Sequence, residues 1–365
     1  FWLKQYSPKG WQRGRKTGWM VWLCRGCGLI GTLVPAIALL LRELLRVGLC
    51  GPFIRTPGTT RFADPSLYDE IVLSQRQREE YFRDGFTVVR GALRPAVLEA
   101  LRPVVVENLN PLMRSIGGFT SNLWMYNDEY LDFLVYSNLG QMAAQVFKSP
   151  NTETASTPEG AYLWRDFLVE RNRVQGRFLA WHADKDECEG DLPANFTARS
   201  RLRFVIPLAD NMLGTVFLNQ SKYVASMDDS EAARYWRGEL PGRACGTHCG
   251  DFWWDDVPPL PGLSLTADAT VKPGRLRLGD VIVFSACAWH RSPGYSEKGL
   301  HFVLQPAFAP ASSRIFGLIP LGCRHGLSAG DLLTGSPSCF LQTYPKEARP
   351  TKGRSLTLHG AFKDC

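Results

Sequence analysis

The sequence predicts an α+β protein, mainly β, in which a layer of helices packs on a jelly roll. Helical patterns come first along the chain, between residues 74 and 147. From Ala161 onward, short strand-like runs separated by turns take over. Helices followed by many short strands are typical of a helical layer on one side of an antiparallel β structure. The chain has 365 residues, enough for one large domain with additions, and it contains no internal repeat.

The charge of the chain is unevenly distributed. The formal net charge is +7, and the lysines and arginines up to Arg25 precede the first acidic residue. A basic front indicates a membrane surface or a targeting segment more than nucleic acid. Basic and aromatic residues are not interleaved in the way that RNA- or DNA-binding motifs require, so we expect no nucleic-acid partner. Because the chain begins with Phe1, we expect a fragment or a processed form.

Residues 1–49 form a basic and apolar N-terminal segment, whose residues 17–41 are mostly apolar. Its uncharged core, 26–41, is shorter than the ~20 residues that a membrane-spanning helix needs. Extension back to Trp19 reaches that length but includes Arg25, which can snorkel to the headgroups. Three interpretations remain open: a membrane anchor, a removable targeting peptide and a helix packed on the following domain. The first two predict a membrane-associated or organelle-targeted protein, without naming the compartment.

The rest of the chain divides into three parts. Residues 50–72 are rich in Pro, Gly and Thr and are predicted to be a linker. Residues 73–310 carry the helical and strand patterns and form the predicted main domain. Residues 311–365, rich in Ser, Gly and Pro, form a C-terminal extension to which we assign no chemistry.

The predicted helical layer has clear local signals. Ser74 and Gln77 match a capping box, in which each side chain bonds the other residue's backbone N–H, and the helix should stop at Gly85. A short strand, 86–89, follows before a second helix with apolar residues at helical spacing. A further helical pattern covers 128–147.

Strand parity gives one long run two different faces. Leu202, Phe204, Ile206 and Leu208 form an apolar face, while Arg201, Arg203 and Val205 share the other. That second face can meet solvent, or it can carry a charged group into a site.

The chemistry-bearing residues are His182, Asp184 and His290. Residues i and i+2 lie on the same side of an extended strand, so His182 and Asp184 can bind one ion. His290 follows a predicted strand 108 positions after His182, a plausible return through a jelly roll. Two imidazoles and one carboxylate form a facial triad, which leaves positions on iron(II) open for a chelating cosubstrate and oxygen. The neighbouring Trp181 and Trp289 can line that pocket or pack within the strands.

Four segments in this order resemble the phytanoyl-CoA dioxygenase family of iron(II)/2-oxoglutarate oxygenases over roughly residues 70–310. They are Tyr81 to Gly91 (YFRDGFTVVRG), Trp181 to Asp184 (WHAD), Ile206 to Asp210 (IPLAD) with Gly214, and Gly279 to Phe284 (GDVIVF) with His290, Arg291 and Ser292. The resemblance implies a cupin-like double-stranded β-helix, with iron(II) held by His182, Asp184 and His290. It also implies 2-oxoglutarate and oxygen as cosubstrates, and succinate and carbon dioxide as products.

The resemblance further assigns individual roles. Related halogenases have a small residue at the carboxylate position, so Asp184 indicates hydroxylation or another oxidation. Ser292 corresponds to the family serine that contacts 2-oxoglutarate. The family arginine that binds the distal carboxylate of 2-oxoglutarate is replaced by His301, and this change is not conservative. A protonated His301, Lys298 or Arg203 can supply the charge, and these alternatives stay open here.

Three functions are compatible with these residues. The first is an iron(II)/2-oxoglutarate dioxygenase acting on a hydrophobic or membrane-associated small molecule. The second is a non-catalytic jelly-roll binding protein, since His301 replaces arginine and Asn219 to Lys222 (NQSK) stands where the family has Pro-Gly-Ser-His. The third is an oxygenase that uses a different 2-oxo acid without a distal carboxylate.

Overall fold

The computed structural model describes residues 60–107, 119–125, 127–147, 160–171, 181–182, 184, 201–218, 270–286, 288–293, 301–314, 331–335 and 340–344. The chain divides into two compact units, 1–45 and 46–365, and every described residue belongs to the second. The apolar segment 17–41 lies outside the described residues. Among the described helices, none has the length and apolar character needed to cross a bilayer.

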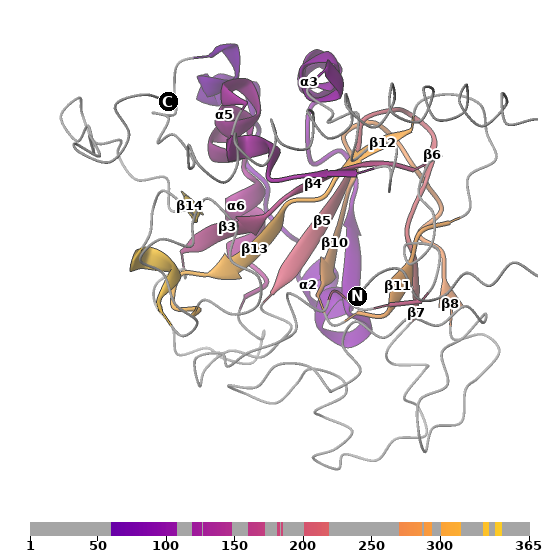
Figure 1. Cartoon of the computed structure of the whole chain (residues 1–365). Helices are drawn as coiled ribbons and strands as arrows, with labels where there is room; N and C mark the ends of the chain where they lie inside the picture. The colour runs from indigo at the N-terminus through magenta and orange to yellow at the C-terminus, as the bar shows by residue number, and fades with distance from the viewer. Residues whose placement is uncertain are drawn as a thin grey trace, which may run out of the picture. The chain divides into compact units, whose positions relative to one another are not determined.

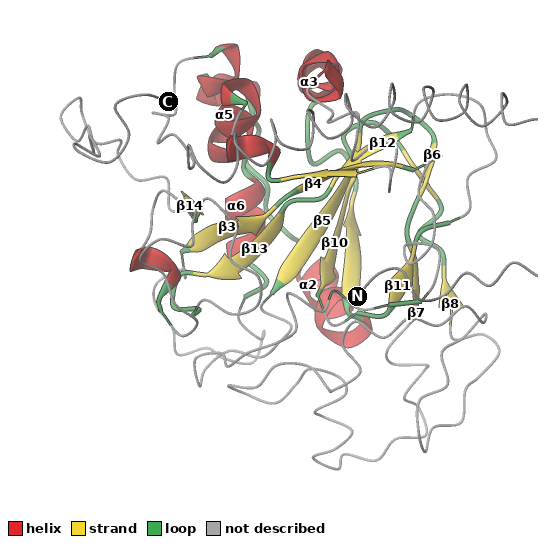
Figure 2. Cartoon of the chain, in the orientation of Figure 1, coloured by secondary structure: helices red, strands yellow, loops and turns green. Residues whose placement is uncertain are grey.

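Helices precede most of the strands, and the described part of the chain is largely antiparallel sheet (Figures 1 and 2). The described α-helices are α2 (Gln75–Asp84), α3 (Pro95–Glu107), α5 (Asp128–Tyr136) and α6 (Leu139–Ala144). The strands are β1 (Phe86–Val89), β2 (Phe119–Ser121), β3 (Ala161–Arg165), β4 (Phe167–Glu170), β5 (Leu202–Pro207), β6 (Met212–Leu213), β7 (Val216–Leu218), β8 (Thr270–Val271), β9 (Arg275–Leu276), β10 (Val281–Ser285), β11 (His290–Arg291), β12 (Phe302–Leu304), β13 (Ala307–Pro310) and β14 (Leu341–Tyr344). The predicted α+β, mainly β class is confirmed.

Helix α2 follows its local signals closely. Ser74 caps it, the reciprocal capping-box bonds with Gln77 are both present, and Gly85 ends it in the left-handed region at φ 81°. The pattern over 128–147 forms two helices rather than one, because Ser137 is extended and its N–H bonds the Phe133 carbonyl as the C-cap of α5. Local capping therefore determines where α2 and α5 end.

The main sheet is built around β5. All its pairings are antiparallel: β10 lies on one side of β5 and in turn pairs with β1, while β12 and β13 share the other side. Beyond them, β12 pairs with β4 and β13 pairs with β3, and β2 and β14 complete the edge. Two smaller sheets, β11-β7-β8 and β6-β9, are separate from it in their hydrogen bonding.

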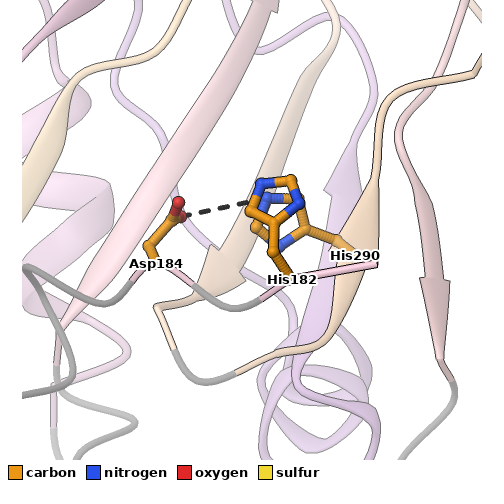
Figure 3. A group of neighbouring side chains, drawn as sticks. All are labelled: His182, Asp184 and His290. Carbon is orange, nitrogen blue, oxygen red and sulfur yellow. Dashed lines mark ion pairs between the residues drawn. The ribbon is translucent and has the colours of Figure 1, made fainter. Parts of the chain in front are cut away.

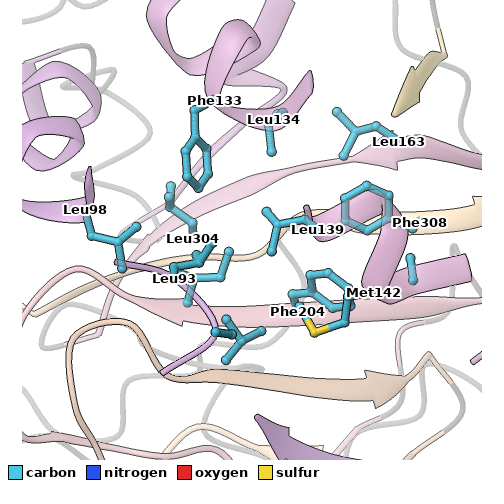
Figure 4. Packing of buried hydrophobic residues seen from close by; sticks show 14 of the residues in the cluster. Leu93, Leu98, Phe133, Leu134, Leu139, Met142, Leu163, Phe204, Leu304 and Phe308 are labelled. Atoms are coloured by element: carbon cyan, nitrogen blue, oxygen red, sulfur yellow. The ribbon is translucent and has the colours of Figure 1, made fainter. Parts of the chain in front are cut away.

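The two faces of the main sheet bury different cores. One face packs against the helices through the predicted apolar face of β5, including Phe204, and residues such as Phe308 and Leu304 (Figure 4). The opposite face carries Val205 and Phe284 and packs against Phe217 of the small sheet. Arg201 and Arg203 lie on this second face and are 1% and 5% exposed, so the face meets protein rather than solvent. Charged groups are thereby held inside, next to apolar side chains.

Two segments outside the predicted strand and helix patterns also belong to this core. In the described part of the predicted linker, Phe62 and Ile71 are buried among the helices, and Thr60 Oγ1 bonds Asp132 at 2.8 Å. Within the predicted C-terminal extension, β14 adds an edge strand to β3, and Phe340 stacks on Trp164 with ring centroids 5.1 Å apart. The linker residues therefore pack among the helices, and the C-terminal segment extends the edge of the sheet.

Gly279→Ala tests a close backbone approach. Gly279 has φ 99° and its carbonyl accepts the Leu93 N–H at 3.0 Å, while an added Cβ would collide with the Leu93 carbonyl oxygen. We expect urea unfolding to show a loss of about 2–3 kcal/mol in unfolding free energy. Gly91→Ala is the matched control, since φ is 61° but nothing lies within 4 Å of its Cβ, and it should lose only about 1 kcal/mol. Equal losses would contradict the steric explanation.

Asp166→Asn tests a buried acid between β3 and β4. Burial raises the pKa of Asp166 to about 7, even though Leu123 N–H donates to its Oδ2 at 3.1 Å. The folded protein keeps this proton up to about pH 7, while the unfolded chain releases it near pH 4, so stability falls as pH rises between these values. The asparagine variant keeps the acceptor without the charge.

At pH 8 we therefore expect the free energy of unfolding of Asp166→Asn to exceed that of the wild type by roughly 1–3 kcal/mol. The variant should accordingly unfold at a higher denaturant concentration. The difference should disappear near pH 3, where the aspartic acid is largely protonated in both states. Denaturant unfolding followed from pH 3 to 8 measures it, and a difference that does not change with pH would refute the prediction.

Candidate metal centre

Backbone pairing brings the two predicted histidines together. His182 and His290 are directly opposed in an antiparallel bridge, with N–H to carbonyl bonds of 3.0 and 2.9 Å in the two directions. Next to it, the Asp184 N–H donates to the Ala286 carbonyl at 3.0 Å, and His290 pairs with Phe217 of β7. The sheet thus places residues that are far apart in the sequence at one point.

The three side chains converge at this point (Figure 3). One ligand atom from each of His182, Asp184 and His290 lies within 4.8 Å of the other two. The two imidazole centroids are 4.4 Å apart, and His290 Nε2 is 3.9 Å from Asp184 Oδ2. His182 and His290 are 7% and 5% exposed. The His-x-Asp geometry expected for an extended strand is therefore what the backbone provides.

His290 is held in an orientation suited to a ligand. Its Nδ1 lies 2.9 Å from the Ala288 carbonyl, which fixes Nδ1 as the donor and leaves Nε2 with its lone pair towards the cluster. The rings of Phe284 and Phe217 lie beside it, at 4.8 and 6.0 Å between centroids. This burial lowers the pKa of His290 to about 3, with the positive charges of Arg203 and Arg171 acting in the same direction. The imidazole is neutral near pH 7, as metal coordination requires.

Arg203 lies against the carboxylate of the cluster. Its Nε is 3.3 Å from Asp184 Oδ2, and its guanidinium stacks over the Phe167 ring at 4.8 Å. The predicted cosubstrate residue is therefore placed beside Asp184, where it orients that carboxylate and offsets its negative charge. Trp181 lies on the opposite face of its strand from His182 and packs under the Arg291 guanidinium at 5.1 Å. Trp181 is a packing residue here.

A second buried arginine lies near the cluster, and the sequence reasoning did not identify it. Arg171 follows β4, is 2% exposed, and donates from Nη1 to Ser292 Oγ and from Nη2 to Thr215 Oγ1, the latter at 2.8 Å. Its backbone N–H donates to the His301 carbonyl at 2.7 Å. The one available signal was strand parity, because Arg171 continues the series Phe167 and Val169 on the inner face of β4.

The remaining predicted cosubstrate residues are placed differently. Ser292 is buried, two residues after His290, and its hydroxyl faces Arg171. His301 is half-buried and directly precedes β12. Lys298 lies outside the described residues, as does the Asn219 to Lys222 segment. Ser292 and Arg203 are therefore on the inner side of the fold, while the direct neighbour of His301 in the sheet is Arg171.

A cavity of about 500 Å³ adjoins this region. Ser292 lines it together with Gly214 and Val216, the residues on either side of Thr215. Lys272, Arg275 and Arg291 also line it, so its described wall is basic. Ser292, whose hydroxyl accepts a hydrogen bond from Arg171, thus borders this cavity. The positive charges in the cavity wall favour anionic ligands.

The ligand set and its spacing fit a transition-metal ion. First-row metals bind nitrogen and oxygen ligands at about 2 Å, so the ligands of one ion lie about 3–4 Å apart. The cluster needs only a small contraction from its present spacing. Two imidazoles and a single carboxylate match the facial set that non-haem iron(II) uses, and catalytic zinc sites can use the same ligand types.

No protein-family model and no curated protein sequence matches the chain. Solved structures to which the chain is similar include the α-ketoglutarate-dependent carbocyclase SnoK from nogalamycin biosynthesis, with 16% identity and a TM-score of 0.49 over 71% of this chain and 93% of that one. The epimerase SnoN, in complex with Fe³⁺, α-ketoglutarate and nogalamycin RO, has 16% identity and a TM-score of 0.46 over 71% and 94%.

HygX from Streptomyces hygroscopicus with iron bound has 12% identity and a TM-score of 0.42, over 72% of this chain and 97% of that one. At such values the likeness does not extend to substrate or chemistry. Any assignment of activity therefore rests on the geometry of the His182, Asp184 and His290 cluster.

His290→Ala should abolish tight metal binding at this cluster. Loss of a directly coordinating imidazole should weaken Co²⁺ binding by more than about 100-fold, because even outer residues of metal sites contribute 10- to 100-fold. Calorimetric titration of the metal-free protein with Co²⁺ measures this change. His301→Ala is the control, since His301 is outside the cluster, and its affinity for Co²⁺ should equal that of the wild type. Unchanged binding in His290→Ala would exclude the site.

Proposed function

We propose that this chain is an iron(II)- and 2-oxoglutarate-dependent dioxygenase of the phytanoyl-CoA dioxygenase type. The observation that carries the proposal is the convergence of His182, Asp184 and His290, one ligand atom of each within 4.8 Å of the others. These three residues would hold iron(II). The two sheets that pack around Phe217 and Phe284 are, in this proposal, the halves of a double-stranded β-helix.

The residues around the ligands suit oxidation chemistry. Iron(II) bound there supplies oxygen activation coupled to the conversion of 2-oxoglutarate into succinate and carbon dioxide, with oxidation of a second substrate. The Ala288 carbonyl keeps the Nε2 lone pair of His290 directed at the ligand cluster. Arg203 holds the Asp184 carboxylate, and the phenyl rings of Phe284 and Phe217 exclude water from one side of His290.

The proposed substrate is a small molecule, hydrophobic in character. The apolar residues 17–41 support association with a membrane or delivery to an organelle, and such a location favours an apolar substrate. This part of the proposal is independent of the metal cluster.

Anaerobic addition of iron(II) and 2-oxoglutarate to the metal-free protein tests the proposal. A visible charge-transfer band from the 2-oxo acid chelate is expected, together with succinate release when oxygen and a substrate are admitted. Asp184→Ala should lose the band, because one of the three ligands is removed.

The control variant is Arg102→Met, which removes an exposed charge of α3 outside the ligand cluster and the cavity and should keep the band. If the wild type gives no band with any 2-oxo acid, the oxygenase assignment is wrong and a non-catalytic binding protein is favoured. A band with shorter 2-oxo acids alone favours an oxygenase with a different cosubstrate.

A further inference from the structure

Arg171 forms a buried cationic site that the iron ligands do not use. Its side chain is 2% exposed and holds two hydroxyls, Ser292 Oγ and Thr215 Oγ1, through different guanidinium nitrogens. A guanidinium has five N–H donors in a planar fork, and these two bonds come from its two terminal nitrogens. The fork is thus fixed in one orientation by hydroxyls from two other parts of the fold.

The two hydroxyls add donors of their own. Each accepts a hydrogen bond from Arg171, so each has its O–H proton directed elsewhere. A planar cation flanked by two hydroxyl donors is an arrangement that a carboxylate fits well, because a carboxylate accepts several hydrogen bonds and forms strong charge-assisted bonds with a guanidinium.

The site lies on the same face of the sheets as the metal ligands. Arg171 continues the inner face of β4 after Val169, and Val169 belongs to the core that contains Phe217 and Phe284. Ser292 is two residues beyond His290 and shares its face of the strand. A molecule that chelates a metal at His290 and extends past Ser292 would bring its far end to Arg171.

The sheet register places Arg171 next to residue 301, the position at which the family has its carboxylate-binding arginine. Phe302 is paired with Glu170, so the next pair along the two strands is His301 and Arg171, and the Arg171 N–H bonds the His301 carbonyl. An arginine side chain on β4 therefore starts from the position adjacent to residue 301. Arg203 is committed to Asp184, at 3.3 Å, which makes it the poorer candidate.

We infer that Arg171, with Thr215 and Ser292, binds the distal carboxylate of a 2-oxo dicarboxylic acid and makes this chain selective for 2-oxoglutarate despite His301. The inference rests on the proposed oxygenase function, and it moves the carboxylate-binding charge from residue 301 to the neighbouring strand. Because Arg171 supplies the positive charge, 2-oxoglutarate can bind although residue 301 is histidine and not arginine.

The test compares two 2-oxo acids that differ in the distal carboxylate. The iron(II) protein is titrated anaerobically with 2-oxoglutarate and with 2-oxobutyrate, and the chelate band gives a dissociation constant for each. We expect the wild type to prefer 2-oxoglutarate by about 100-fold, the effect of one charged bidentate contact. In Arg171→Met the preference should fall below about tenfold, with the affinity for 2-oxobutyrate changed by less than about threefold.

Two further variants guard against loss of folding. Thr215→Val keeps the side-chain shape, and it should weaken 2-oxoglutarate by about five- to tenfold without weakening 2-oxobutyrate. Arg171→Lys keeps the charge but not the fork, so its preference should lie between those of the wild type and Arg171→Met. Thermal unfolding of each variant separates folding defects from binding defects.

Arg102→Met is the control, because it removes an exposed positive charge of α3 that lies outside the metal cluster and the cavity. Its preference between the two acids should equal that of the wild type. The inference is overturned if Arg171→Met keeps the preference, if it weakens both acids equally, or if Arg102→Met loses as much as Arg171→Met. A wild type that forms no chelate with either acid overturns the proposed function instead, and the inference with it.

Discussion

The candidate site depends on one antiparallel contact, the backbone pair of His182 and His290. Two N–H to carbonyl bonds of 3.0 and 2.9 Å join these residues and put both imidazoles on the same side of the sheet. Asp184 follows two positions later, and its N–H to Ala286 bond continues the same alignment. A shift of this register by one residue would turn His290 to the opposite face and separate it from the other ligands. The positions of the three metal ligands therefore depend on this register.

That register is stabilised by burial on both faces of the main sheet. The helices cover one face through Phe204 and its neighbours, and the smaller sheet covers the other through Phe217, which stacks on Phe86 at 4.3 Å between centroids. The apolar strand residues on the two faces thus pack into two separate cores. Buried apolar side chains resist slippage, because any shift would expose one set and bury polar groups in its place.

Charged groups are placed inside this apolar frame, and their pairing organises the site. Arg203 meets Asp184, while Arg171 meets the hydroxyls of Ser292 and Thr215. Both arginines act on His290, whose ring is kept neutral chiefly by burial. Positive charge inside a protein favours anionic ligands and disfavours a protonated imidazole, so the same arginines prepare the site for metal and for carboxylate.

Much of the local structure and the identity of the ligands could be predicted from the sequence, because they depend on nearby residues. The capping box at Ser74, the stop at Gly85 and the two faces of β5 all follow from short-range hydrogen bonding and strand parity. The pairing of β4 with β12, which sets Arg171 beside His301, is decided by contacts between strands more than a hundred residues apart. No local pattern encodes such a register, so only the tertiary structure identified Arg171 and placed Arg203 against Asp184.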